Sequence, residues 1–167
     1  MNSRYESNPR EVERMNTAEL RENFLVESLF ADDEIKLTYT HYDRLVLGGI
    51  KPVSKKLALG TYDDLKSEFF LERREIGIIN VAGDGQVEVD GEVFSVEKLS
   101  CLYLGRGTKQ VAFSSKDAAN PACFFILSAP AHQTYANKLF TKEDASPVTL
   151  GAPETSNHRT IYKYIHN

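Results

Sequence analysis

Apolar and polar residues alternate with a period of two over much of the chain. Ile35, Leu37 and Tyr39 alternate with polar neighbours, which is the pattern of a half-buried strand. Further short apolar runs follow, at a spacing close to that of sandwiches and barrels. The runs are 45–47, 56–59, 69–71, 76–79, 87–89, 93–96, 102–104, 111–113 and 123–127. Together these segments predict about ten short strands and little helix after residue 30.

Glycine-containing turns separate several of these runs. Asp90-Gly91 fits a two-residue type I′ turn, in which both central residues have positive φ. Gly83-Asp84-Gly85 fits a tight corner between strands, while Gly48-Gly49 and Gly60 are expected to end strands. Two successive corners fold a sheet back over a core. We therefore predict an all-β antiparallel β-barrel or jelly roll.

The two ends of the chain depart from this pattern. Residues 1–15 are polar and expected to be loosely held, and Asn16 with Glu19 fits the capping box of one short helix. After Ser128 the alternation fades, which predicts a long C-terminal arm that wraps the barrel or leads to a further part of the protein. An apolar pattern resumes near residue 161. The predicted divisions are 1–20 (polar segment and helix start), 21–128 (barrel) and 129–167 (arm or linker).

Composition and charge narrow the class of partner. The residues are 41% apolar and 26% charged, which is normal for a soluble globular protein. The net charge of −4 and the absence of a basic stretch argue against a nucleic-acid partner. No apolar run is long enough to span a bilayer, and no signal peptide is visible. Cys101 and Cys123 lie in apolar runs and are interpreted as reduced thiols rather than a disulfide, so we expect a cytoplasmic protein.

Few residues are candidates for chemistry. The histidines lack the short spacing of zinc ligands, and no GxSxG, P-loop or helix-opening GxGxxG motif is present. These histidines are His41, His132, His158 and His166. The cluster Glu72-Arg73-Arg74-Glu75 is either a guanidinium fork for an acidic ligand or a salt-bridged loop or subunit contact. Residues 39–44 either line a pocket or form a solvated turn.

Two motifs resemble the cupin pattern, G-D-G-x-V-x-V-D-G and Y-L-G-R-G-T-K-Q-V. In metal-binding cupins, histidines and a glutamate on adjacent strands converge on one ion. Here the region of the first motif, residues 69–83, has no histidine, and Gln110 stands about where the metal histidine of the second would be. Because a neutral amide is a poor zinc ligand, the resemblance implies a cupin-like barrel without the metal.

Longer stretches resemble the amino-terminal half of the 4-deoxy-L-threo-5-hexosulose-uronate ketol-isomerase family. They are FLVESLF, THYDRLVLGGI, FFLERREIGIINVAGDGQVEVDGE, LYLGRGTKQVAF, PAHQTYANK and SPVTLGAPETSNHRTIYKYI. The resemblance implies a two-cupin, homo-oligomeric enzyme that interconverts 5-keto-4-deoxyuronate and 3-deoxy-glycero-2,5-hexodiulosonate in pectin breakdown. It also implies a zinc ion held by the carboxy-terminal cupin.

The resemblance carries no catalytic or metal-binding residue to this chain, because the family's zinc ligands lie beyond Asn167. We expect a structural and oligomerising half that holds no metal and shows no isomerase activity alone. Arg44, Arg73 and Arg74 are the candidates for contact with the carboxylate of the deoxyuronate substrate. The alternative is a stand-alone, metal-free cupin module for binding or oligomerisation, without turnover. A sugar-sensing regulator is weaker still, since no helix-turn-helix is visible.

Overall fold

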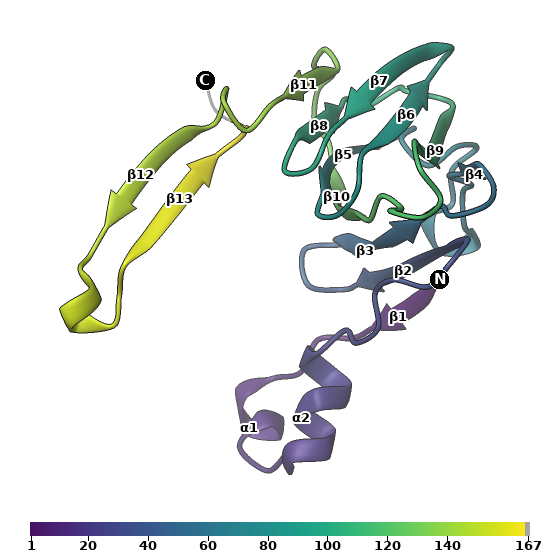
Figure 1. Cartoon of the computed structure of the whole chain (residues 1–167). Coiled ribbons are helices and arrows are strands. Elements are labelled where there is room, and N and C mark those ends of the chain that lie inside the picture. Colours follow the sequence, from purple (N-terminus) through teal and green to yellow (C-terminus); the bar gives the residue numbers. More distant parts are fainter. Residues whose placement is uncertain (166–167) are drawn as a thin grey trace.

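A computed structural model describes residues 1–165, and most of its strands form two sheets (Figure 1). The seven-stranded sheet has the order β1 (Asn2–Arg4), β2 (Glu34–Thr40), β3 (Val46–Lys51), β10 (Phe124–Pro130), β5 (Arg74–Asn80), β8 (Cys101–Leu104) and β11 (Lys138–Phe140). The four-stranded sheet has the order β4 (Leu57–Ala58), β9 (Val111–Ser115), β6 (Gly85–Val89) and β7 (Glu92–Val96). Strand β10 therefore lies at the centre of the larger sheet, between β3 and β5.

The core lies between the two sheets. Along β5, buried and half-buried residues alternate over all seven positions, so one face of the strand packs inward. Phe113 of β9 and Phe124 of β10 join the sheets, with ring centroids 5.3 Å apart and both side chains fully buried. Burial of each such side chain contributes about 1.5–3 kcal/mol. The prediction of an all-β fold of the jelly-roll class is confirmed.

Two details of the predicted antiparallel barrel are different. Apart from β12 and β13, the described strands form two separate sheets packed as a sandwich, not a closed barrel. In addition, β1 pairs in parallel with β2, with Ser3 opposite Tyr39, inside the segment that was expected to be loosely held. An edge strand can be polar on both faces because backbone hydrogen bonds alone hold it. Residues 2–4 are all polar, so they show no apolar–polar alternation from which strand β1 could be predicted.

Glycine is required at two of the predicted turns, for a different reason at each. Asp90 and Gly91 have φ values of 48° and 91°, which confirms the type I′ turn between β6 and β7. Gly83 lies at the corner where the chain leaves the larger sheet for the smaller. A Cβ atom on Gly83 would lie 1.9 Å from the carbonyl oxygen of Asn120, so close backbone approach requires glycine there.

A buried amide holds this corner together. Asn80, the last residue of β5, is fully buried, and its Nδ2 donates to the carbonyl oxygens of Gly83 (2.7 Å) and Val96 (2.8 Å). Its Oδ1 accepts hydrogen bonds from the backbone nitrogens of Ala82 and Cys123, both at 3.3 Å. One side chain thus satisfies four backbone groups that strand pairing leaves free at the corner.

The amino-terminal region holds both α-helices of the described chain, α1 (Pro9–Val12) and α2 (Thr17–Phe24), which lie beyond β1 in Figure 1. Asn16 and Glu19 form the predicted capping box at the start of α2.

Two predictions about strand extent are wrong. Residues 69–71 form a turn, in which Phe70 and Leu71 are buried, and Gly48-Gly49 does not end β3. β3 continues because it pairs with β2 on one side and β10 on the other. Two 3₁₀ turns complete the elements, η1 (Asp63–Leu65) and η2 (Pro153–Thr155).

The carboxy-terminal arm consists of β11, which pairs with β8, and a hairpin of β12 (Ser146–Leu150) and β13 (Arg159–Lys163). Figure 1 shows this hairpin apart from the two sheets, and all five residues of β13 are exposed. β10 continues across residue 129, where the arm was predicted to begin, and three short strands follow in a segment whose sequence shows no clear alternation. The three predicted divisions of the chain stay predictions. Within residues 1–165, no helix is long and apolar enough to cross a membrane.

Candidate functional site

The three predicted arginines meet at one end of the larger sheet, around a cavity of about 150 Å³. Arg74 begins β5 opposite Pro130, the last residue of β10, and Arg44 lies in the β2–β3 turn at the same end. The cavity is lined by Tyr39, Arg44, Asp64, Leu65, Ser67, Arg73, Arg74 and Pro130. The fold therefore brings together arginines that are 30 residues apart in sequence. We call this space the arginine cavity.

Arg74 is the buried member of the arginine cavity. Its side chain faces inward in the same register as Ile76, and the residue is only 7% exposed. Nε donates to Ser128 Oγ (3.1 Å), and Nη2 donates to the carbonyl oxygens of Arg44 (2.7 Å) and Ser128 (2.9 Å). Burial lowers the pKa of the Arg74 guanidinium; Tyr39 opposes this lowering, and the Arg44 guanidinium adds to it. The site thus concentrates positive charge in a poorly solvated place.

None of the acidic side chains in residues 1–165 forms an ion pair with these three arginines. The described ion pairs are Arg21–Glu27, Lys51–Asp32 and Lys56–Glu88. Arg73 donates to the carbonyl oxygen of Lys66, and Nη1 of Arg74 has no hydrogen-bond acceptor in the described part of the chain. Asp64 lines the cavity, more than 4 Å from each guanidinium group.

The charged cluster at residues 72–75 is therefore not a salt-bridged loop. The Glu72 carboxylate accepts a hydrogen bond from the Glu68 backbone nitrogen (2.7 Å), and Glu75 accepts one from the Tyr103 hydroxyl (2.7 Å). Strand geometry separates Arg74 from Glu75, because successive side chains of β5 point to opposite faces. The subunit-contact interpretation of this cluster stays a prediction.

Both interpretations of residues 39–44 hold in part. Tyr39 and Arg44 line the arginine cavity, while Asp43 and Arg44 form the exposed turn between β2 and β3. These two turn residues have φ values of 53°, a left-handed conformation that is strained for side chains other than glycine, asparagine and aspartate. His41 stacks on Tyr5 with ring centroids 4.3 Å apart, so its ring has a structural role.

The residues discussed for metal binding do not come together. His132 and His158 are exposed, and His166 lies outside the described residues. Gln110 is also exposed, so its placement at an inward metal-ligand position is wrong; the inward positions of β9 are Val111 and Phe113. No group of three or more histidine, cysteine, aspartate or glutamate side chains that could hold a metal ion exists in residues 1–165. This part of the chain does not fit the zinc ion that the resemblance implies for the family.

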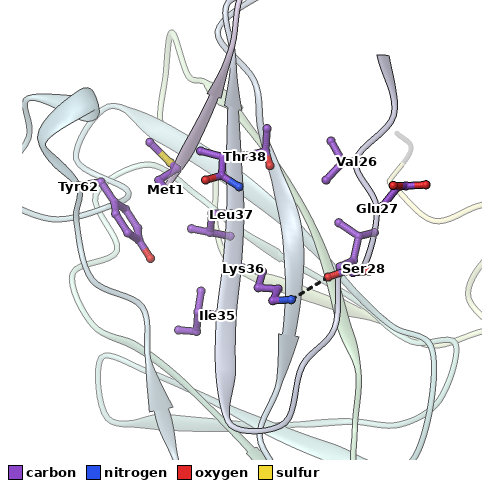
Figure 2. Close-up of a pocket in the computed structure, with 11 residues that line it drawn as sticks. Met1, Val26, Glu27, Ser28, Ile35, Lys36, Leu37, Thr38 and Tyr62 are labelled. Atoms are coloured by element: carbon purple, nitrogen blue, oxygen red, sulfur yellow. Dashed lines mark hydrogen bonds between the residues drawn. The ribbon is translucent and has the colours of Figure 1, made fainter. Parts of the chain in front are cut away.

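A larger cavity of about 290 Å³ borders β2 and the amino-terminal segment (Figure 2). Figure 2 shows Met1 and Tyr62 at one side of this cavity and Val26 and Glu27 at the other. Its charged side chains already have partners, because Lys36 Nζ donates to the Ser28 carbonyl oxygen (3.2 Å) and Glu27 pairs with Arg21. Neither of these side chains is therefore free to hold a ligand.

The outer surface of the larger sheet is apolar. A cavity of about 320 Å³ lies on it, and Leu127, one of its lining residues, is 45% exposed. We define the outer apolar face by Leu45, Ile79, Phe125, Leu127 and Ala129, which line this cavity from β10, β5 and the β2–β3 turn. Exposed apolar side chains that gather on one face can mark an interaction site.

Ser128 does not line the arginine cavity, but it is the fully buried partner of Arg74 that the sequence did not reveal. Its hydroxyl accepts from Arg74 Nε and donates to the carbonyl oxygen of Glu75 (2.6 Å). The available signal was the alternation from Arg74 to Asn80, which places Arg74 on the inward face of its strand. A charged residue at an inward-facing position of a strand predicts a buried polar partner. The identity of that partner depends on the pairing of β5 with β10.

Known proteins resemble the chain in sequence and fold. It is 50% identical over 167 residues to a 4-deoxy-L-threo-5-hexosulose-uronate ketol-isomerase of Halalkalibacterium halodurans. The alignment covers all of this chain and 60% of that relative. The relative of the same name in Formosa agariphila is 52% identical over 163 residues, 98% of this chain and 58% of the relative. The chain therefore spans about 60% of the length of these curated relatives.

Among solved structures, an IolB-like protein from Salmonella typhimurium LT2 superposes with a TM-score of 0.54 at 14% identity. The superposition covers 71% of this chain and 43% of that protein, and it supports the all-β fold alone. The model of the KduI/IolB family matches residues 24–167. With this match over most of its length, the chain belongs to the KduI/IolB family.

Proposed function

We propose that the chain is the amino-terminal part of a ketol-isomerase of uronate and pectin catabolism. The proposed reaction interconverts 5-dehydro-4-deoxy-D-glucuronate and 3-deoxy-D-glycero-2,5-hexodiulosonate. The observation that carries the proposal is the 50% identity across all 167 residues with the relative from H. halodurans, whose name gives this activity. Homology at this level over a whole chain preserves the fold and the surroundings of a site.

Ketol isomerisation needs several chemical groups that act together on the substrate. A proton must move between neighbouring carbon atoms while a carbonyl and a hydroxyl exchange places, which requires a general base and a stabiliser for the enediol intermediate. The described residues hold no cluster that fits a metal ion. We therefore place the zinc site and the proton transfer in the part of the protein that the relatives have beyond this region.

The role proposed for this chain is architectural. The outer apolar face exposes Leu127 and half-buries Phe125 and Ile79, and an association with another protein surface would remove this area from water. We propose that this face lies in contact with the rest of the enzyme or with another subunit of a homo-oligomer. The proposed location is the cytoplasm.

A chimera tests the proposed function. The 167 residues are joined to the remaining 40% or so of the H. halodurans relative, after the position where the alignment ends. We expect isomerase activity and one zinc ion per chain from the chimera, and no turnover from the 167-residue chain with added zinc. The intact relative, purified in the same way, is the control. Turnover by the chain alone, or a folded zinc-loaded chimera without activity, would contradict the proposal.

The second candidate is a stand-alone, metal-free module for binding or oligomerisation. The outer apolar face favours it, because such a surface needs a partner but no chemistry. The mass and zinc content of the protein isolated from its natural source distinguish the two candidates. A longer protein with stoichiometric zinc supports the isomerase, whereas a metal-free product of 18.8 kDa supports the module.

A further inference from the structure

The arginine cavity has an excess of positive charge that the described protein does not neutralise. Three arginines and one acidic residue, Asp64, line it, and the Asp64 carboxylate lies beyond ion-pair distance of the arginines. Arg74 is buried there and hydrogen-bonds only to a hydroxyl and two carbonyl oxygens. Removing a cation from water without an opposite charge costs several kcal/mol, so buried arginines normally have an anionic partner.

The free donor of Arg74 indicates where that anion binds. Every fully buried side-chain nitrogen and oxygen in residues 1–165 has a hydrogen-bond partner. Nη1 of Arg74 has none, so it is not fully buried, and Arg74 lines the arginine cavity. The other nitrogens of Arg74 are fixed by Ser128 and by the Arg44 carbonyl oxygen, which holds the guanidinium plane in one orientation. A fixed guanidinium is suited to a planar oxyanion.

We propose that the arginine cavity binds the carboxylate of a sugar acid, with Arg74 as the buried anchor and Arg44 and Arg73 at the exposed mouth. The carboxylate accepts a hydrogen bond from the free nitrogen of Arg74. The hydroxyls of Tyr39 and Ser67, in the same lining, are the partners for sugar hydroxyls, and Pro130 offers an apolar wall. The choice of a sugar acid over other carboxylates rests on the proposed function.

The strained turn supports a site rather than a simple connection. Arg44 has a left-handed backbone, with φ of 53°, where glycine or asparagine is usual in a two-residue hairpin turn. Strain of this kind costs on the order of 1–3 kcal/mol and occurs most often where function requires a particular side chain. The carbonyl oxygen of Arg44 also fixes Arg74, so the turn contributes to the cavity through both its backbone and its side chain.

The test measures ligand binding to the purified 167-residue chain by titration calorimetry at low ionic strength. D-Galacturonate is the sugar-acid probe, D-galactose is its uncharged counterpart, and inorganic phosphate is the competing oxyanion. We expect galacturonate to bind and galactose not to bind. We also expect the affinity for galacturonate to fall when salt is raised, because screening weakens the contacts with the two exposed arginines.

Substitutions of the exposed arginines test whether galacturonate binds in the arginine cavity. Arg44→Asn keeps a residue that tolerates positive φ and removes the charge, and Arg73→Gln removes the second exposed charge. The double variant is expected to bind galacturonate at least tenfold more weakly, with an unchanged circular dichroism spectrum. Arg14→Gln, at an exposed arginine in the amino-terminal segment, is the matched control and should bind as the unmodified chain does. We leave Arg74 unchanged because its removal also disturbs the fold.

Four results would overturn the inference. They are no binding of galacturonate by the chain, equal binding of galactose and galacturonate, unchanged galacturonate binding by the folded double variant, and displacement of galacturonate by an equal or lower concentration of phosphate. The proposed function is tested separately by the chimera. An active chimera with no galacturonate binding by the chain would refute the cavity alone, and an inactive, folded chimera with normal binding would refute the isomerase alone.

Discussion

Replacing Asn80 with alanine tests whether the buried amide at the corner is a main support of the sandwich. The change removes two short hydrogen bonds to carbonyl oxygens, at 2.7 and 2.8 Å, and two longer ones from backbone nitrogens, at 3.3 Å. A buried group that loses its partner costs about 1–3 kcal/mol, and the longer bonds contribute less. We expect the free energy of unfolding to fall by about 3–4 kcal/mol, which is near the upper end of point-mutation effects.

Urea unfolding followed by circular dichroism measures this loss. With a slope of about 2 kcal/mol per molar urea, the midpoint should fall by about 1.5–2 M while the slope stays constant. Asn80→Asp should be at least as destabilising, because a carboxylate would face the carbonyl oxygens of Gly83 and Val96. Asn120→Ala is the control, since Asn120 is exposed beside the same corner. A midpoint shift below about 0.5 M for Asn80→Ala would refute the reasoning.

Three other sites test separate parts of the structure. Gly83→Ala places a Cβ atom 1.9 Å from a carbonyl oxygen and should lower the urea midpoint, at a cost of about 1–3 kcal/mol; an unchanged midpoint would contradict the close approach. Hydrogen bonds from the Ser54 hydroxyl and nearby backbone nitrogens lower the pKa of Asp33 well below its ordinary 3.8. Ionised Asp33 therefore stabilises the fold above about pH 4 and loses this effect as pH falls, so Asp33→Asn should flatten the acid decline of the melting temperature. Burial raises the pKa of Cys101 to about 11 and also raises the pKa of Cys123, but Cys123 is only half-buried. DTNB at pH 8 should therefore label Cys123 first, and equal fast labelling of both thiols would count against the fold.

The strands of the sandwich were predictable because each has one buried face. In β5 the inward residues Ile76 and Ile78 alternate with half-buried neighbours, and β6 and β9 follow the same rule. The prediction failed at residues 69–71, since three consecutive apolar residues can bury themselves in a turn as well as in a strand. It also missed β1, whose pairing with β2 depends only on the backbone.

The arginine cavity was predictable in its residue types but not in its geometry. Charge density singled out Arg73 and Arg74, and the polar turn singled out Arg44. Their meeting depends on which strands are neighbours, and Ser128 is 54 residues from the arginine that it holds. The error over Gln110 has a similar origin, because a shift of one residue moves a side chain from the inner face to the outer face.

The central place of β10 determines the order in which this protein can fold during translation. The ribosome completes β2, β3, β5 and β8 before it makes residues 124–130, so the nascent chain carries two separate strand pairs with no bridge between them. Each pair presents an open edge to the other components of the cell until β10 emerges from the exit tunnel. A ribosome that stalls before residue 124 would therefore release an aggregation-prone fragment. A pause that begins after residues 124–130 have left the exit tunnel would be harmless, because β10 can then bridge the two pairs.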